Sequence, residues 1–247
     1  MKLFVFLREV FYDLKLLLRN IPSLTVAIFI LSVVCANLMA NKELINYKFL
    51  ALDCGYFFSW IMFLTMDVIC KRFGAKASVK ISVVALVINL FVTLSFALLS
   101  ETDGMWGAYY ATGNIEVNQA LNATFASSWF VVLGSSLAFF TGSVVNAFFN
   151  HGIAKKTKLK GFWEFALRSY ISTFIAQFSD NLVFSCFIAK FFFGWSWQQV
   201  FLSSFVAALI ELSLEIVFSG FGYRIVLSWQ KEGVGQEYLD KQKSGIG

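Results

Sequence analysis

Residues 81–100, ISVVALVINLFVTLSFALLS, form a continuous apolar run without a charged side chain. A helix needs about 20 residues to cross a hydrocarbon core roughly 30 Å thick, so this run predicts a membrane-spanning helix. The composition of the whole chain agrees, because 58% of its 247 residues are apolar and 14% are charged. A soluble domain usually carries about 25% charged residues.

Similar apolar segments recur along the chain and predict six transmembrane helices, over residues 22–41, 49–70, 79–100, 123–149, 165–193 and 198–229. The predicted fold is therefore an all-α integral membrane protein with one membrane domain, residues 21–230. Pro22, the single proline, stands where the first span begins. Residues 231–247 are polar, and we expect them to form a frayed cytoplasmic tail.

The N-terminal segment, residues 1–20, has apolar residues at helical spacing and places Arg8, Lys15 and Arg19 on the other side. This pattern predicts an amphipathic helix that lies on the inner membrane surface. The segment makes a poor signal peptide, because no apolar core is followed by a small-residue cleavage site.

Basic residues predict the orientation of the spans. Of the 20 Lys and Arg residues, 17 fall on the side of the two termini, and only Lys42, Lys48 and Lys190 fall on the other. Loops rich in Lys and Arg stay on the cytoplasmic side. We therefore expect a multi-pass protein of the bacterial cytoplasmic (inner) membrane with both ends in the cytoplasm.

The predicted outer loop, residues 101–122, contains no basic residue and is rich in aromatic side chains, including Trp106, Tyr109 and Tyr110. Trp and Tyr favour the membrane interface, so an aromatic belt explains this composition. A lid over an outward-facing site is the alternative.

Polar side chains inside two spans indicate a binding site. In the fifth span Thr173, Gln177 and Asp180 follow the i, i+4, i+7 spacing of one helix face, with Asn181 beside them, and the sixth span carries Glu211 and Glu215 one turn apart. An ionisable residue at mid-bilayer costs about 2.5–3.5 kcal/mol on insertion scales, and no basic residue stands at the same depth. We interpret this cluster as a substrate site, to which Asn37 of the first span could contribute. The alternative is that these groups only join helices by hydrogen bonds.

Two acidic features allow further alternatives. Asp67 lies near the inner end of the second span beside a basic loop, where a structural ion pair, a helix-end role or a substrate role all fit; for Thr173 a structural or gating role is also open. Glu211 and Glu215, without a basic partner, are expected to share a titration. Such a pair suggests proton coupling, or else a protonated hydrogen-bond donor between helices.

Two segments of the chain resemble the VUT (YhhQ-like) family of queuosine precursor transporters. FLTMDVICKRFGAKASVK, residues 63–80, is similar to its pattern of an Asp, an aromatic-Gly-Ala turn and a basic stretch. YISTFIAQFSDNLVFSCFIA, residues 170–189, is similar to its Ser-Thr, amide and Ser-Asp pattern at Gln177, Ser179 and Asp180. The resemblance implies secondary uptake of deazaguanine bases and a fold like that of energy-coupling-factor substrate-binding subunits, working alone.

The chemistry of the cluster suits such a base. Its adjacent N–H and amine can both donate to one carboxylate, its carbonyl and pyrrole N–H suit an amide such as Gln177 or Asn181, and its flat face suits aromatic stacking. The predicted substrate-binding residues are Gln177, Asp180, Asn181, Glu211, Glu215 and Asn37.

The sequence also allows comparison of transport with two other classes of function, a binding subunit and an enzyme. A vitamin- or nucleobase-binding subunit that works with a separate ATPase module is the alternative, and Ala36 and Ala40 have the Ala-x-x-x-Ala spacing typical of such subunits. The sequence has no HExxH motif, no GxSxG motif and one histidine, His151, so we expect no catalytic site, cofactor or metal. The expected partners are the small-molecule substrate and the lipid bilayer, not nucleic acid, and self-association into a homo-oligomer is compatible with the sequence.

Overall fold

The computed structural model describes residues 2–40, 42–102, 116, 119–120, 122–123, 129–157 and 160–244. Trp106, Tyr109 and Tyr110 of the predicted outer loop lie outside these residues, so the choice between a belt and a lid stays a prediction.

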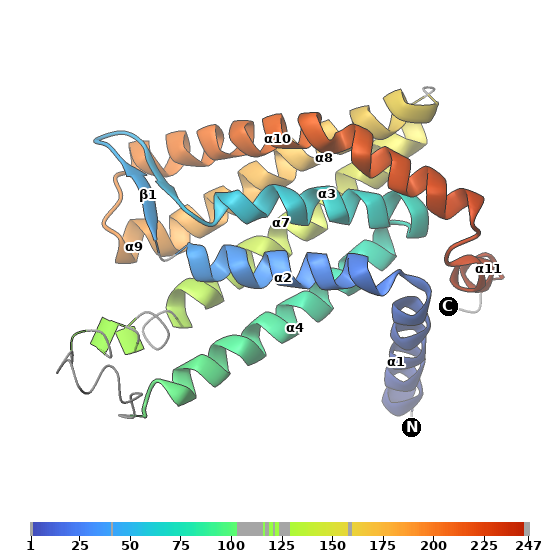
Figure 1. Cartoon of the computed structure of the whole chain (residues 1–247), viewed down its shortest axis with the longest axis horizontal. Helices are drawn as coiled ribbons and strands as arrows, with labels where there is room; N and C mark the ends of the chain where they lie inside the picture. The colour runs from blue at the N-terminus through green and yellow to red at the C-terminus, as the bar shows by residue number, and fades with distance from the viewer. Residues whose placement is uncertain are drawn as a thin grey trace.

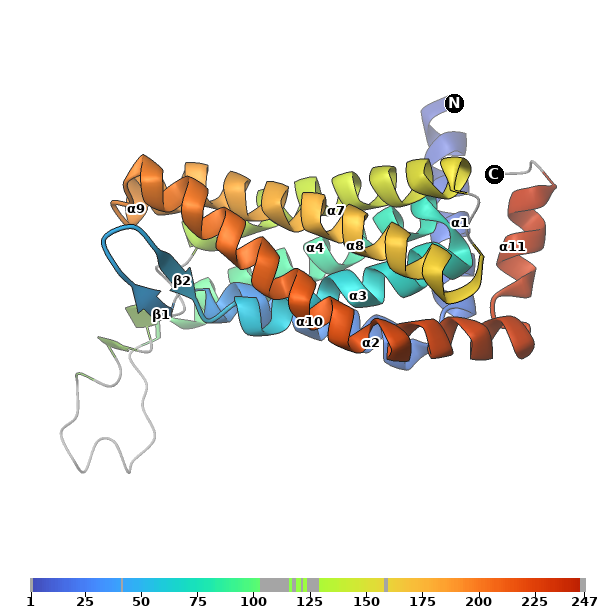
Figure 2. The same ribbon diagram turned by 90° about the horizontal axis from the view of Figure 1, so that it is seen from above.

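Six long helices lie side by side in a bundle (Figures 1 and 2): α2 (Ser23–Met39), α3 (Tyr56–Phe73), α4 (Ala75–Leu99), α7 (Trp129–Lys156), α8 (Gly161–Phe184) and α10 (Trp197–Lys231). The chain of α8 continues through a π-helical turn, Ser185–Ala189, into the short helix α9, Lys190–Phe192. Helix α3 packs against all five of its neighbours. Polar side chains on α3 can therefore face protein instead of lipid.

The number of candidate spans among the described residues is smaller than the sequence predicted. Four helices are long and apolar enough to cross a membrane, namely α4, α7, α8 with its continuation, and α10, and a fifth is added if α1 and α2 count as one bent span. Helix α2 has only 17 residues, and α3 carries Asp67, Lys71 and Arg72 among its 18. The structure thus agrees with a helical membrane protein, while six spans remain a prediction.

A β-hairpin replaces the first turns of the predicted second span. Strands β1 (Glu43–Asn46) and β2 (Ala51–Asp53) pair antiparallel, so the prediction of helix from Phe49 was wrong. Apart from this small hairpin, the described residues agree with an all-α membrane protein. The backbone N–H of Ala51 donates to Ser203 Oγ on α10 over 2.9 Å, which ties the hairpin to the bundle. The hairpin lies at the end of the bundle opposite the two chain termini (Figure 1).

Helix α1 (Lys2–Asn20) leaves the bundle sharply. Its segment from Arg8 makes an angle of 107° with α2, and the break falls at Ile21 and Pro22. Proline has no N–H to continue the hydrogen bonding of α1, but it is tolerated at the start of the next helix. Val10, Phe11 and Tyr12 of α1 are exposed, and the location of α1 on the inner membrane surface stays a prediction.

The C-terminal tail was predicted to fray, but it forms helix α11 (Gln236–Lys243), which packs against α1 (Figure 1). Asp13 of α1 accepts hydrogen bonds from Lys241 and Gln242, both over 3.1 Å, and pairs with Lys80 of α4. Burial alone would raise the pKa of Asp13, but the hydrogen bonds from Lys80 and Lys241 outweigh it and lower that pKa below its usual range. One carboxylate thus joins three helices.

The turn before α11 also contacts the bundle, through Arg72 and Phe73 of α3. Arg72 donates two hydrogen bonds to the carbonyl oxygen of Val234, over 2.9 and 2.5 Å. Gly235 has φ +76°, and a Cβ there would lie 2.1 Å from Cε1 of Phe73. Both the backbone conformation and the contact with α3 therefore require glycine at this turn.

We predict that Asp13→Asn loosens the docking of α11, at a cost on the order of 1 kcal/mol, since the partners are only partly buried. Amide hydrogen exchange over residues 236–243 should become faster. Asp240→Asn, the same change on an exposed face of α11, is the control and should leave exchange unchanged.

The same contact should depend on pH. Because the pKa of Asp13 is lowered in the folded protein, its contribution is complete above the unfolded value of about 3.9 and is lost as the pH falls through the folded value. Equal exchange over residues 236–243 in wild type and Asp13→Asn would contradict this account of the docking.

Candidate functional site

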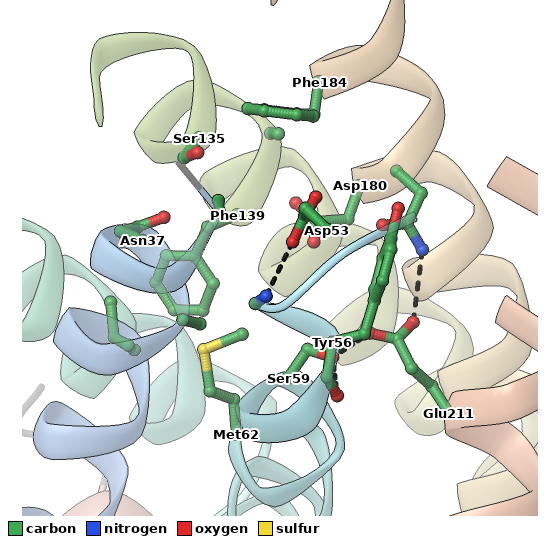
Figure 3. A pocket seen from close by; sticks show the side chains of 16 residues that line it. Asn37, Asp53, Tyr56, Ser59, Met62, Ser135, Phe139, Asp180, Phe184 and Glu211 are labelled. Atoms are coloured by element: carbon green, nitrogen blue, oxygen red, sulfur yellow. Dashed lines mark hydrogen bonds between the residues drawn. The ribbon is translucent and has the colours of Figure 1, made fainter. Parts of the chain in front are cut away.

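A cavity with a volume of about 60 Å³ lies among α2, α3, α7, α8 and α10 (Figure 3). Polar side chains line much of it: Asn37, Asp53, Tyr56, Ser59, Ser135, Asp180, Asn181 and Glu211.

Three carboxyl groups face this cavity, those of Asp53, Asp180 and Glu211 (Figure 3). Glu211 is 1% exposed, accepts a hydrogen bond from Asn181 Nδ2 over 3.1 Å, and accepts another from Ser59 Oγ. The described residues that line the cavity include no Lys, Arg or His. The site is therefore rich in acceptors and lacks a cation of its own.

Asp53 is placed by the turn that begins α3. Its Oδ1 accepts the backbone N–H of Gly55 over 2.7 Å. A Cβ on Gly55 would lie 2.7 Å from the carbonyl oxygen of Ala36 and 2.8 Å from Asp53 Oδ1, so the turn packs directly on α2. Burial raises the pKa of Asp53 to about 7, although the Gly55 hydrogen bond opposes the rise. Near neutral pH this side chain can therefore either donate or accept.

Aromatic rings form part of the cavity wall. Phe139 of α7 is 3% exposed and packs on Phe29 of α2 with 6.1 Å between the ring centroids. Tyr56 and Phe184 complete this set (Figure 3). Flat rings beside carboxylates suit a planar ligand that carries N–H donors at its edge.

The structure divides the residues that the sequence grouped together. Asn37, Asp180, Asn181 and Glu211 line the cavity, whereas the other four predicted residues, Gln177, Glu215, Asp67 and Thr173, do not. These other four residues are fully buried. They lie deeper in the bundle, toward the end that holds the chain termini.

Asp67 forms the centre of this deeper group. Its Oδ1 accepts from Asn146 Nδ2 over 2.8 Å and from Asn150 Nδ2 over 3.2 Å. Its Oδ2 accepts from Thr173 Oγ1 over 3.0 Å and from Ser169 Oγ. These four partners are neutral, and the Glu215 carboxyl group also interacts with Asp67. Among the described residues Asp67 has no basic partner, so the suggested ion pair with the basic loop is wrong. The residue is 0% exposed and lies in the second half of α3.

Sequence reasoning missed four polar residues of the cavity, namely Asp53, Tyr56, Ser59 and Ser135. Asp53 could have been found, because it is an acidic residue within the apolar stretch FLALDCGYFF and is followed two residues later by Gly55. Such an Asp-x-Gly sequence favours a turn, and a turn there exposes the carboxyl group at the start of a helix.

A second hollow leads from the cavity toward the hairpin end of the molecule. It has a volume of about 190 Å³, is lined by hairpin residues together with Phe193 and Trp195, and shares Ala40 and Asp53 with the cavity. The carboxyl group of Asp53 thus stands at the boundary between the two spaces. A ligand could reach the cavity from this end by passing Asp53.

Comparison with known proteins gives one match. The model of a family described as "putative vitamin uptake transporter" matches residues 53–225, which run from Asp53 through the whole of α8 and most of α10. No curated protein and no solved structure matches the chain. The family match covers well over half of the chain and most of the cavity lining, and it agrees with the apolar helices. The chain therefore belongs to the "putative vitamin uptake transporter" family of membrane transporters.

Proposed function

We propose that the protein imports deazaguanine precursors of queuosine across the bacterial cytoplasmic membrane by secondary transport, and that it binds them in the cavity below the hairpin. The observation that carries this proposal is the set of three carboxyl groups, Asp53, Asp180 and Glu211, around a cavity whose described lining has no cation.

Electrostatics narrows the class of vitamin or base that fits. Two like charges 4 Å apart repel by about 4 kcal/mol at an effective dielectric constant of 20. A vitamin that carries a carboxylate or phosphate would meet this repulsion from Asp180 or Glu211 whenever that side chain is ionised. A base with several N–H donors, or with a protonated amine, would be attracted instead.

The geometry of the lining supports recognition of a guanine-like edge. One carboxylate can accept an N–H and an adjacent amine together, and Asp180 is available for this role beside Asp53 (Figure 3). Asn181 lies next to Glu211 and offers amide chemistry for a carbonyl or a pyrrole N–H. Phe139 and Tyr56 offer ring faces for stacking.

The transport proposal includes six spans with both termini in the cytoplasm. Helix α3 would be the second span, since its contacts with five other helices allow Asp67 to face protein and not lipid. Helix α2, with 17 residues, is at the short end of the range for a span. The same proposal includes a fold that resembles that of energy-coupling-factor substrate-binding subunits.

The proposal favours a transporter that acts alone over a substrate-binding subunit that needs a separate ATPase module. Ala36 and Ala40, the pair with the Ala-x-x-x-Ala spacing, both line the cavity. Small residues there leave room for a ligand, which accounts for them without an ATPase partner.

Asp180→Asn should fold but transport poorly. Loss of a charge-assisted hydrogen bond costs about 1.5–3 kcal/mol, or roughly tenfold or more in affinity. Salvage of an added deazaguanine base, measured as queuosine in tRNA of cells that cannot make the precursor, should fall accordingly. Asp240→Asn is the matched control, and normal salvage by Asp180→Asn would remove Asp180 from the site.

Binding should also depend on the charge of Asp53. Because its pKa is raised to about 7, the carboxylate acceptor is present above that pH and is lost as the pH falls below it. The affinity of the purified protein for an uncharged deazaguanine base, measured by calorimetry about one pH unit below and above 7, should therefore increase with pH. Asp53→Asn should flatten this dependence; an unchanged pH profile would argue against a contact with the ligand.

The proposed topology can be tested by cysteine labelling in a background without the four native cysteines. Lys76→Cys and Lys156→Cys, both exposed near the ends of helices, should be protected from an impermeant maleimide added to intact cells. Lys48→Cys, exposed in the hairpin turn, should be labelled. Labelling at position 156 from outside would rule out the six-span arrangement.

A further inference from the structure

Buried polar side chains continue from the floor of the cavity toward the cytoplasmic end of the bundle. They follow one another at intervals of one helical turn, because residues three or four apart lie on the same helix face. From the cavity inward, α8 presents Asn181, Gln177, Thr173 and Ser169, α10 presents Glu211 and Glu215, and α7 presents Ser143, Asn146 and Asn150.

Ser169 joins two carboxyl groups within this column. Its Oγ lies within hydrogen-bond distance of Asp67 Oδ2 on α3 and of Glu215 Oε1 on α10. A hydroxyl has a single proton and can donate to only one of them. The second contact is a hydrogen bond only if the other carboxyl group carries a proton and donates it to Ser169.

Hydrogen bonding identifies which of the two acids carries that proton. Asp67 has four donors for its two oxygens, as an ionised carboxylate requires. Glu215 is 0% exposed, and its Oε2 has no hydrogen-bond partner among the described residues. A buried carboxylate with an unpaired oxygen is costly, so this arrangement assigns the proton to Glu215, which donates to Ser169, which donates to Asp67.

The charged and titratable groups around this chain do not supply a direct counter-charge for Glu215. Arg168 on α8 is engaged with Asn150 Oδ1, over 2.7 and 3.1 Å, and with Glu164, over 3.0 Å. On α3 the neighbours of the chain are Asp67 itself and Cys70, which contacts Asn150. Glu211 stands one turn away on α10, and α7 contributes only neutral amides at this depth.

A polar layer connects Glu215 with the cavity. Between them lie Gln177, whose two amide atoms have no partner among the described residues, and Ser143, whose hydroxyl has none either. Asn146 Oδ1 on α7 is likewise unpaired. Buried polar atoms of this kind in native proteins are usually satisfied by water or a ligand. Water molecules held by these atoms would give a proton a route between the cavity and Glu215.

We propose that Glu215, Ser169 and Asp67 form a proton relay that couples substrate uptake to the proton gradient. In one step the proton of the Glu215 carboxylic acid moves to Ser169 Oγ while the Ser169 hydroxyl proton moves to Asp67 Oδ2. Glu215 then becomes a carboxylate and Asp67 a carboxylic acid, with no net change in charge or in proton number. The relay itself is a property of the bundle, but its coupling to uptake rests on the proposed function.

Infrared spectroscopy of the purified protein tests the relay without any substrate. A carboxylic acid has a C=O stretching band that a carboxylate or an amide lacks. Glu215→Gln should remove one such component from the wild-type spectrum at neutral pH, whereas Ser169→Ala should retain it. A wild-type spectrum unchanged by Glu215→Gln would overturn the assignment of the proton. Gln can still donate to Ser169, so the variant should fold, which gel filtration in detergent would verify.

Proteoliposomes that contain a trapped pH-sensitive dye test the coupling. With one proton per substrate, an inward gradient of about one pH unit should raise accumulation of a deazaguanine base about tenfold. Glu215→Gln and Ser169→Ala should both lose this response, while Ser213→Ala, on the exposed side of α10 and bonded to the Leu209 carbonyl, should keep it. A full response in Ser169→Ala would overturn the relay. Failure of the wild type to take up any deazaguanine would refute the proposed substrate and leave the infrared result standing.

Discussion

The hydrogen bonds to Asp67 hold the interior of this protein together. Its carboxyl group, fully buried on the central helix α3, is bound by Asn146 and Asn150 of α7 and by Ser169 and Thr173 of α8. A buried carboxylate without such partners would cost far more than the membrane insertion penalty of about 3 kcal/mol, and each missing donor leaves a penalty of about 1–3 kcal/mol. The positions of α7 and α8 against α3 are therefore tightly specified. Because Asp53 and Gly55 lead directly into α3, which begins at Tyr56, the same constraint positions one wall of the cavity.

The interior acids fall into two groups that differ in how they are satisfied. Asp67 is supplied with donors entirely by the protein, and Glu215 shares the hydroxyl of Ser169 with it. The carboxyl groups of Asp53, Asp180 and Glu211 instead border open space. The bundle thus surrounds the deeper acids with its own hydrogen-bonding side chains, whereas the acids nearer the hairpin face a cavity that a ligand can fill. The family match to vitamin uptake transporters, over residues 53–225, includes both groups.

Much of the helical framework could be predicted from hydropathy, because uncharged runs such as residues 81–100 have few alternatives to a helix. The hairpin could not be predicted, since the mostly apolar residues 49–53 are compatible with a strand as well as with a helix. The structure shows a strand there, whose Ala51 N–H bonds to Ser203 of α10. Docking of α11 was also beyond sequence reasoning, because it depends on Asp13 meeting Lys241, more than two hundred residues away along the chain.

The site was predictable in kind but not in detail. Helical spacing placed Gln177 and Asp180 on one face, yet only Asp180 lines the cavity. Gln177 lies three residues earlier, about 4.5 Å farther along the helix axis, in the layer below the cavity. The long-range partners of Glu211, Ser59 from α3 and Asn181 from α8, follow from packing that periodicity does not reveal.

The central claim is that the acid-lined cavity binds the transported molecule. A structure of the purified protein determined with a bound deazaguanine base tests it most directly. The account predicts the base between the rings of Phe139 and Tyr56, with its N–H edge within hydrogen-bond distance of Asp180 or Glu211. A base bound elsewhere in the bundle, or bound in the cavity with no carboxylate contact, would contradict it.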